Sequence, residues 1–346
     1  MAADGLDLAE YDFTLPAERI AQEPPPERDA GRLLVLERAG GRLRHEAVRA
    51  LGACLSPGDL LVVNASRVLP AKLRGRKPSG GAAEALLLGA EGGGRFRALL
   101  RASGHPRPGL KLRFGSGPGA LDAEVAELRA DGELTLAFAE GADPYAIGEA
   151  PLPPYIRREA PREVDRERYQ TAFARVPGSV AAPTAGLHLS PRLLRDLEAR
   201  GIERAELVLH VGAGTFRPVG AEALARGELH PERYELPAAT AERIRAARAR
   251  GSRVVAVGTT SARVLETCAG PDGVPRPGRG TTRLFLRPGA RFRAVDALLT
   301  NFHLPRSSLL LLVAAFAGRE RVLAAYAEAI ARGYRFYSYG DAMLVL

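Results

Sequence analysis

Two runs of small residues, each with one histidine, are the stretches of this sequence best suited to chemistry. Residues 178–188 end in His188, and residues 209–216 contain His210. An imidazole can accept or release a proton near neutral pH. Glycine and alanine beside it let a substrate approach the backbone closely. The two runs therefore predict a pocket in which His188 and His210 transfer protons.

His303 is a third candidate for proton transfer. It follows an apolar run that is typical of a strand. Open α/β sheets usually build their sites in the loops after strands, which favours a site at His303. A structural role, as a hydrogen-bonded polar group, stays open for each of the three histidines.

Residues 253–266 have the pattern of an anion site. The apolar run 253–257 predicts a buried strand, Gly258 ends it, and Thr260 and Ser261 stand at the start of the next helix. Backbone N–H groups at such a helix start attract negative charge. Capping of the helix by the two hydroxyls is the alternative explanation.

Other catalytic motifs are not matched. Residues 211–218 begin like a dinucleotide-binding fingerprint, but no third glycine follows and Pro218 interrupts any helix. No Gly-x-Ser-x-Gly run marks the nucleophile of a hydrolase. His, Cys and carboxylate residues do not recur at the spacing of metal ligands, so we expect no bound metal.

The composition is that of a folded protein with a basic surface. The 346 residues are 46% hydrophobic and 26% charged, which suffices for a large core and predicts two domains. The formal net charge is +9, and arginine supplies nearly all of the positive charge. Arginine binds phosphate and stacks on bases, so the charge indicates nucleic-acid binding. A GC-rich genome would also raise the arginine content.

A few segments bear on location. No N-terminal apolar stretch resembles a signal peptide, and the most apolar run, residues 309–316, is far shorter than the ~20 residues of a membrane span. Cys54 and Cys268 are the two cysteines, and so few thiols are typical of a reducing compartment. A disulfide between them stays open. We expect a cytoplasmic protein with no membrane contact.

Strand-length apolar runs alternate with helical patterns over most of the chain, which predicts an α/β main domain. Ser190 is a good N-cap, Pro191 suits a first helical position, and Gly201 ends that helix. The strands are expected at 33–37, 60–64, 205–209, 253–258 and from 297, and the helices at 165–176, 190–201, 238–250, from 259, 307–317 and 319–332.

Residues 75–149 have a different texture, with short β-like runs separated by glycine-rich turns. Such a pattern is typical of a small barrel or sandwich. We expect residues 75–149 to form an inserted small β-barrel domain, and residues 1–74 and 150–346 to form one discontinuous, layered α/β main domain. The five expected strands are 84–88, 95–101, 110–114, 123–128 and 133–138.

Five motifs, in this order, closely resemble those of the S-adenosylmethionine:tRNA ribosyltransferase-isomerase family of queuosine biosynthesis. The resemblance extends nearly from end to end and is weakest in the inserted β region. The chain departs from the family pattern at Asn64-Ala-Ser-Arg67, where an acidic residue is usual. The motifs are Gly-Ser-Val-Ala-Ala-Pro-Thr-Ala-Gly-Leu-His188, His210-Val-Gly-Ala-Gly-Thr-Phe216, Gly258-Thr-Thr-Ser-Ala-Arg263, Thr300-Asn-Phe-His-Leu-Pro305 and Tyr339-Gly-Asp-Ala-Met343.

The resemblance implies a specific reaction. The ribosyl group of S-adenosylmethionine, a co-substrate, is transferred to 7-aminomethyl-7-deazaguanine at the wobble position of tRNA and isomerised to give epoxyqueuosine. Adenine and methionine leave, and the family needs no metal. We expect a monomer that binds the anticodon arm of tRNA, with proton transfer by His188, His210 and His303.

The resemblance also suggests binding residues. Alternatives stay open for several of them, since Arg263 could pair with Glu266 and the C-terminal aromatic rings could belong to the core. The cofactor-binding candidates are Thr184, Gly186, Gly212, Gly214, Thr215, Thr260, Ser261 and Arg263. The RNA-binding candidates are Arg67 and Lys72 for phosphate, and Phe336, Tyr337 and Tyr339 for stacking on bases.

Two other functions remain to be tested. An S-adenosylmethionine-dependent tRNA methyltransferase would leave S-adenosylhomocysteine, whereas the reaction above releases adenine and methionine. A non-catalytic RNA-binding protein would bind tRNA without consuming the co-substrate. That reading would leave the clustered His, Thr and Gly residues without a role.

Overall fold

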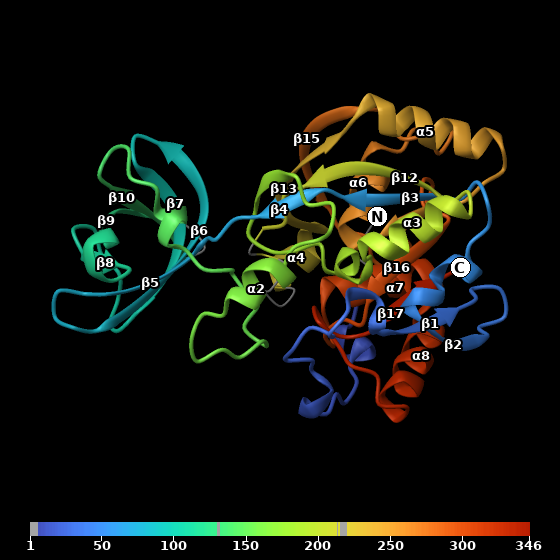
Figure 1. The fold of residues 1–346 in the computed structure, drawn as a ribbon, viewed down its shortest axis with the longest axis horizontal. Coiled ribbons are helices and arrows are strands. Elements are labelled where there is room, and N and C mark those ends of the chain that lie inside the picture. The colour runs from blue at the N-terminus through green and yellow to red at the C-terminus, as the bar shows by residue number, and fades with distance from the viewer. Residues whose placement is uncertain (1–5, 130–131, 213, 215–219) are drawn as a thin grey trace.

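The computed structural model describes residues 6–129, 132–212, 214 and 220–346. Figure 1 shows a small barrel beside a larger α/β body. The chain leaves the body to form the barrel and then returns, so the body consists of two segments. This is the fold class that the sequence predicts.

A mixed sheet, nine-stranded over the described residues, forms the middle of the body. The neighbouring strands β12, β3, β14 and β16 run parallel, so their carboxyl ends lie at one edge of the sheet. In spatial order the strands are β15 (Gly278–Leu284), β13 (Glu228–Leu236), β12 (Glu203–Leu209), β3 (Leu60–Asn64), β14 (Val254–Val257), β16 (Ala297–Asn301), β17 (Ala342–Val345), β1 (Arg32–Leu36) and β2 (Leu43–Ala47).

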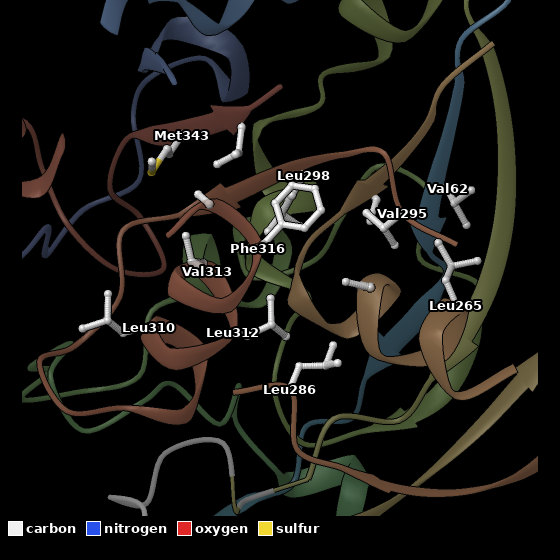
Figure 2. Close-up of a cluster of buried hydrophobic side chains, with 14 of the residues drawn as sticks. Val62, Leu265, Leu286, Val295, Leu298, Leu310, Leu312, Val313, Phe316 and Met343 are labelled. Carbon is white, nitrogen blue, oxygen red and sulfur yellow. The ribbon is translucent and has the colours of Figure 1, made fainter. Parts of the chain in front are cut away.

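Both faces are covered in the middle of this sheet, because alternate residues of the inner strands enter two different cores. Leu34 and Val62 belong to one core, shown in Figure 2, and Leu33 and Leu61 belong to the other. Burial on both faces explains why these strands are apolar without alternation. Helices α5 (Ala238–Ala249), α6 (Thr259–Cys268), α7 (Ser308–Ala317) and α8 (Arg319–Ala331) fill the first core, and α1 (Leu51–Cys54) and α3 (Pro191–Ala199) cover the second.

The inserted region is a closed barrel of six strands within the described residues. Phe96 and Phe138 pack edge to face in its interior, with ring centroids 5.6 Å apart. Five of the strands were expected, and β5 was not, because its basic residues suggested a solvated cluster. Around the barrel the strands are β10 (Glu133–Phe138), β7 (Arg95–Ala102), β6 (Ala82–Gly92), β5 (Lys72–Arg76), β8 (Lys111–Phe114) and β9 (Leu121–Leu128).

Two chain crossings connect the barrel with the body, and they are bonded to each other. The N–H of Lys72 donates to the carbonyl of Glu149 at 3.2 Å, and the N–H of Glu149 donates back at 2.8 Å. Gly148 is needed here, because a Cβ would lie 1.7 Å from the carbonyl oxygen of Pro70. The expected boundaries at 75 and 149 lie close to these crossings and stay a prediction.

Most expected helices are present, and one is wrong. Ser190 caps α3 as predicted, its hydroxyl accepting the N–H of Leu193 at 3.0 Å. The helix expected over 165–176 ends at Arg168, because Tyr169 and Phe173 pack into different cores and form no single stripe. The other α-helices and strands are α2 (Glu163–Arg168), α4 (Ala221–Arg226), β4 (Ser66–Val68) and β11 (Val176–Ser179), and the 3-10 helix that contains His188 is η8 (Thr184–His188).

Three expectations about location and ligands concern the whole chain. In the described ranges, no helix has both the length and the apolar character that crossing a bilayer requires. Cys54 and Cys268 are free thiols. No cluster of three His, Cys, Asp or Glu side chains within the described residues could hold a metal ion.

Candidate active site

The carboxyl ends of the parallel strands carry the polar residues of the site. His210 follows β12, Asn64 ends β3, Gly258 follows β14 and Asn301 ends β16. The Asn64 amide nitrogen donates to the carbonyl of Leu209 at 2.9 Å, and its oxygen accepts the N–H of Leu209 at 3.0 Å. Asn64 therefore fixes the end of β12, directly before His210.

A cavity of about 390 Å³, called here the apolar cavity, lies at this edge of the sheet. It receives the start of α6 at Gly258 and the start of α7 at Ser307. Aromatic rings form part of its wall, and those of Tyr155 and Tyr337 lie 4.6 Å apart. Its polar lining includes Thr184, Thr259, Thr260, Thr300, Asn301, His303 and Ser338.

The start of α6 lies in the wall of the apolar cavity, and a helix start favours negative charge. Gly258 has a φ of 88°, which turns the chain from β14 directly into the helix, and the first N–H groups of a helix have no partner within it. Thr260 lines the cavity, as the sequence predicts for a binding residue. Ser261 does not, because its hydroxyl donates to the carbonyl of Val257 at 2.8 Å inside the helix.

His303 is buried in the wall of the apolar cavity. Its Nε2 shares a hydrogen bond with the hydroxyl of Thr300 at 2.8 Å, and its backbone N–H donates to the Tyr326 hydroxyl at 3.0 Å. Burial lowers the pKa of His303 to about 3. The ring is therefore neutral near pH 7 and can exchange hydrogen bonds with a bound molecule.

A second cavity, of about 540 Å³, lies between the body and the barrel and is called here the histidine cavity. The body contributes His210, His230 and Glu232 to it. Both cavities are lined by Val211 and Leu309, so they adjoin. Other residues of the histidine cavity are Gly178, Gly212, Gly214, Arg233 and Arg263 from the body, and Glu91, Arg97 and Glu133 from the barrel.

His210 is half-buried in the histidine cavity, with the backbone of Gly178 against its ring. A Cβ at Gly178 would lie 2.7 Å from Cε1 and Nδ1 of His210. Among the described residues no group hydrogen-bonds Nδ1 of His210. Burial, together with the positive charge of Arg233, lowers the pKa of His210. A neutral imidazole of this kind can accept a proton.

A buried ion pair joins Glu232 and Arg263 in the wall of the same cavity. Glu232 also accepts the N–H of Gly212 at 2.8 Å, so it fixes the loop that follows His210. The alternative that Arg263 pairs with Glu266 is wrong. Glu266 instead accepts backbone N–H groups of residues 293–295. The sequence alone did not indicate the pair of Glu232 and Arg263, because the two residues lie on different elements.

His188 lies elsewhere. Its side chain is 3% exposed, and it is not among the residues described as lining either cavity. The Asn301 amide nitrogen donates to Nε2 of His188 at 3.1 Å and to the carbonyl of Tyr337 at 3.0 Å. Burial lowers the pKa of His188 to about 4. The structure does not bring His188 and His210 into one cavity, and His188 instead orients Asn301.

The glycine and threonine candidates divide between the cavities. Thr184 lines the apolar cavity, and Gly212 and Gly214 line the histidine cavity. Gly186 serves packing, because a Cβ there would lie 2.8 Å from the Phe173 ring. Thr215 lies outside the described residues.

The RNA-binding candidates differ in exposure. Arg67 is exposed on β4, and Lys72 pairs with Glu84 at 2.9 Å on the barrel. The rings of Phe336 and Tyr339 are buried, and the Tyr339 hydroxyl donates to Asp165 at 3.0 Å. Tyr337 is buried in the wall of the apolar cavity. The prediction that these three rings stack on RNA bases is therefore wrong: Phe336 and Tyr339 pack in the interior, and Tyr337 faces the apolar cavity instead.

The α/β body with its inserted barrel has two adjoining cavities, which hold neutral imidazoles and the start of a helix. This is the arrangement of an enzyme whose site can bind a substrate and exchange protons with it. The chain belongs to the family described as queuosine biosynthesis protein, whose model matches residues 8–345. This confirms the family expected from the five motifs.

Curated relatives match over nearly the whole chain and are named S-adenosylmethionine:tRNA ribosyltransferase-isomerase. The relative from Anaeromyxobacter sp. (strain Fw109-5) is 53% identical over 98% of this chain and 98% of its own length. The relative from Moorella thermoacetica is 50% identical over 98% of this chain and 99% of its own. The relative from Geobacter sulfurreducens is 48% identical, with the same coverage.

A solved structure has the same architecture. It is the crystal structure of S-adenosylmethionine tRNA ribosyltransferase from Thermotoga maritima, 38% identical in sequence, with a TM-score of 0.56. The alignment covers 97% of this chain and 100% of that one.

Proposed function

We propose that this protein is an S-adenosylmethionine:tRNA ribosyltransferase-isomerase. It transfers the ribosyl group of S-adenosylmethionine to the aminomethyl arm of 7-aminomethyl-7-deazaguanine at the tRNA wobble position. The sugar is isomerised to the epoxide of epoxyqueuosine, and adenine and methionine are released. The observation that carries the proposal is identity of 53% to a relative of that name, over 98% of both chains.

The apolar cavity suits S-adenosylmethionine. Its aromatic wall, with Tyr155 and Tyr337, fits the adenine ring, and the start of α6 fits the carboxylate of the methionine part. Thr184 and Thr260 supply hydroxyls for polar groups of the co-substrate. His303, neutral in the same wall, offers a hydrogen bond to adenine as it leaves.

The histidine cavity suits the modified base. It lies beside the apolar cavity, so a base placed there brings its aminomethyl arm to the sugar of the co-substrate. The arm attacks as a neutral amine and must lose a proton, and a carbon next to the sulfonium is also acidified. His210, a neutral base with a free Nδ1 within the described residues, is the residue we assign to proton acceptance.

The reaction products test the proposal. The protein is incubated with S-adenosylmethionine and tRNA that carries the deazaguanine precursor, the tRNA is digested, and nucleosides and free bases are separated. The proposal predicts epoxyqueuosine and free adenine in equal amounts. S-adenosylhomocysteine would instead indicate a methyltransferase, and an unconsumed co-substrate with tRNA bound would indicate a binding protein.

The remaining proposals concern assembly and place. We propose that the protein acts as a monomer. Light scattering is expected to give the mass of one chain without tRNA, and the mass of one chain plus one tRNA when tRNA is bound. Because the substrate is tRNA, we place the protein in the cytoplasm, which fractionation of the cells would check.

A further inference from the structure

The largest cavity described in the protein, about 810 Å³, is not used by the proposed chemistry. It lies between strands β5, β6 and β7 of the barrel and residues 148–166 of the body, and is called here the basic cleft. Its volume is about twice that of the apolar cavity, and its walls come from both parts of the protein.

Cationic side chains predominate in the basic cleft. Seven arginine or lysine residues and four carboxylates line it, a difference of three positive charges. Three of the cations pair with lining carboxylates, as Arg158 does with Asp165 at 2.7 Å. Arg101, Arg157 and Arg166 are exposed and make no ion pair with any residue that the structure describes.

The basic cleft lies next to the apolar cavity, which in turn lies next to the histidine cavity. Pro154 lines both the basic cleft and the apolar cavity. Val211 and Leu309 in turn line both the apolar cavity and the histidine cavity. The three therefore adjoin in series: the basic cleft and the histidine cavity lie between barrel and body, and the apolar cavity lies between them in the body.

We infer that the basic cleft binds the phosphate backbone of an RNA strand, through Arg101 on the barrel and Arg157 and Arg166 on the body. This rests on the proposed function and deepens it, since it names where the tRNA backbone lies. Guanidinium groups without a carboxylate partner are free to fork onto phosphate oxygens. A strand held there is next to the cavity that receives the co-substrate, so its neighbouring nucleotide can enter the site.

The test is tRNA binding as a function of salt. Fluorescence anisotropy with full-length protein gives the Kd at several salt concentrations for the wild type, for Arg101→Ala, for Arg157→Ala/Arg166→Ala and for the triple variant. Each lost phosphate contact lowers the slope of log Kd against log salt by about one. The triple variant is expected to show a slope lower by about three and a Kd at least tenfold higher, with the KM for S-adenosylmethionine unchanged.

Arg95→Ala is the matched control. Arg95 is an exposed arginine on β7, the strand of Arg101, and is not among the residues described for the cleft. Its replacement removes one positive charge, as Arg101→Ala does, and is expected to leave the slope within about 0.3 of the wild type. All changed residues are exposed, so thermal unfolding should be unaffected.

Two results would overturn the inference. One is a triple variant with the Kd and salt slope of the wild type. The other is a loss of tRNA affinity in Arg95→Ala as large as that in Arg101→Ala. Neither touches the proposed function, which is refuted separately if the wild type forms no epoxyqueuosine and no adenine.

Discussion

Replacing Gly178 by alanine should displace the imidazole of His210. A Cβ at this position lies 2.7 Å from Cε1 and Nδ1 of His210, whereas unbonded carbon atoms settle about 3.5–4.0 Å apart. The ring or the backbone must therefore move by about 1 Å. The φ of Gly178 is 141°, where a side chain adds about 1–3 kcal/mol of strain.

The displacement should reduce turnover more than binding. A reacting group that is misplaced by about 1 Å lowers the rate by roughly 10²-fold. The assay is release of free adenine at saturating S-adenosylmethionine and tRNA, with tRNA affinity measured in parallel. Gly178→Ala is expected to lower kcat about 100-fold and to leave the Kd for tRNA within twofold.

Gly278→Ala is the control, because a Cβ at Gly278 of β15 meets no atom within 4 Å. It should keep the kcat and the unfolding temperature of the wild type. If Gly178→Ala is folded and turns over within twofold of the wild type, the placement of His210 beside the reacting groups is wrong.

Three other outcomes are expected. Glu232→Gln leaves Arg263 buried without its countercharge, so urea unfolding should show a loss of about 3–5 kcal/mol, and a loss below 1 kcal/mol would contradict the pair. Burial lowers the folded-state pKa of His188 from 6.5 to about 4 and that of His303 to about 3. Below pH 6.5 the unfolded chain therefore binds more protons than the folded one, and the free energy of unfolding falls as the pH drops. His188 alone should account for about 3 kcal/mol of that fall by pH 4, and His188→Gln should flatten the profile. Asn301→Leu should raise the KM for S-adenosylmethionine, because Asn301 lines the apolar cavity, and an unchanged KM would remove it from the binding wall.

Local signals in the sequence were sufficient for much of the fold. The cap at Ser190, the turn at Gly258 and the apolar strands depend on neighbours in the chain, and the structure has each of them. Strand β5 was not predicted, because most of its side chains are basic and point outward. Leu73, which packs inside the barrel, is its single apolar residue. A barrel closes through partners on other strands, which a local pattern does not contain.

The sequence predicted which types of residue line the site, but not how they are arranged in space. His210 and Thr260 line cavities, but they line different ones. His188 ends one run of small residues and His210 begins another, yet long-range packing buries His188 against Asn301. Glu232 pairs with Arg263, 31 residues away, and the pair forms only when helix α6 packs against strand β13.

Single-turnover release of adenine by His210→Ala tests the central claim most directly. The account predicts a rate at least 10²-fold below that of the wild type, as expected when a proton acceptor is removed, with tRNA affinity retained. His105→Ala, at an exposed position of the barrel, should match the wild type. An undiminished rate in His210→Ala would contradict proton transfer in the histidine cavity.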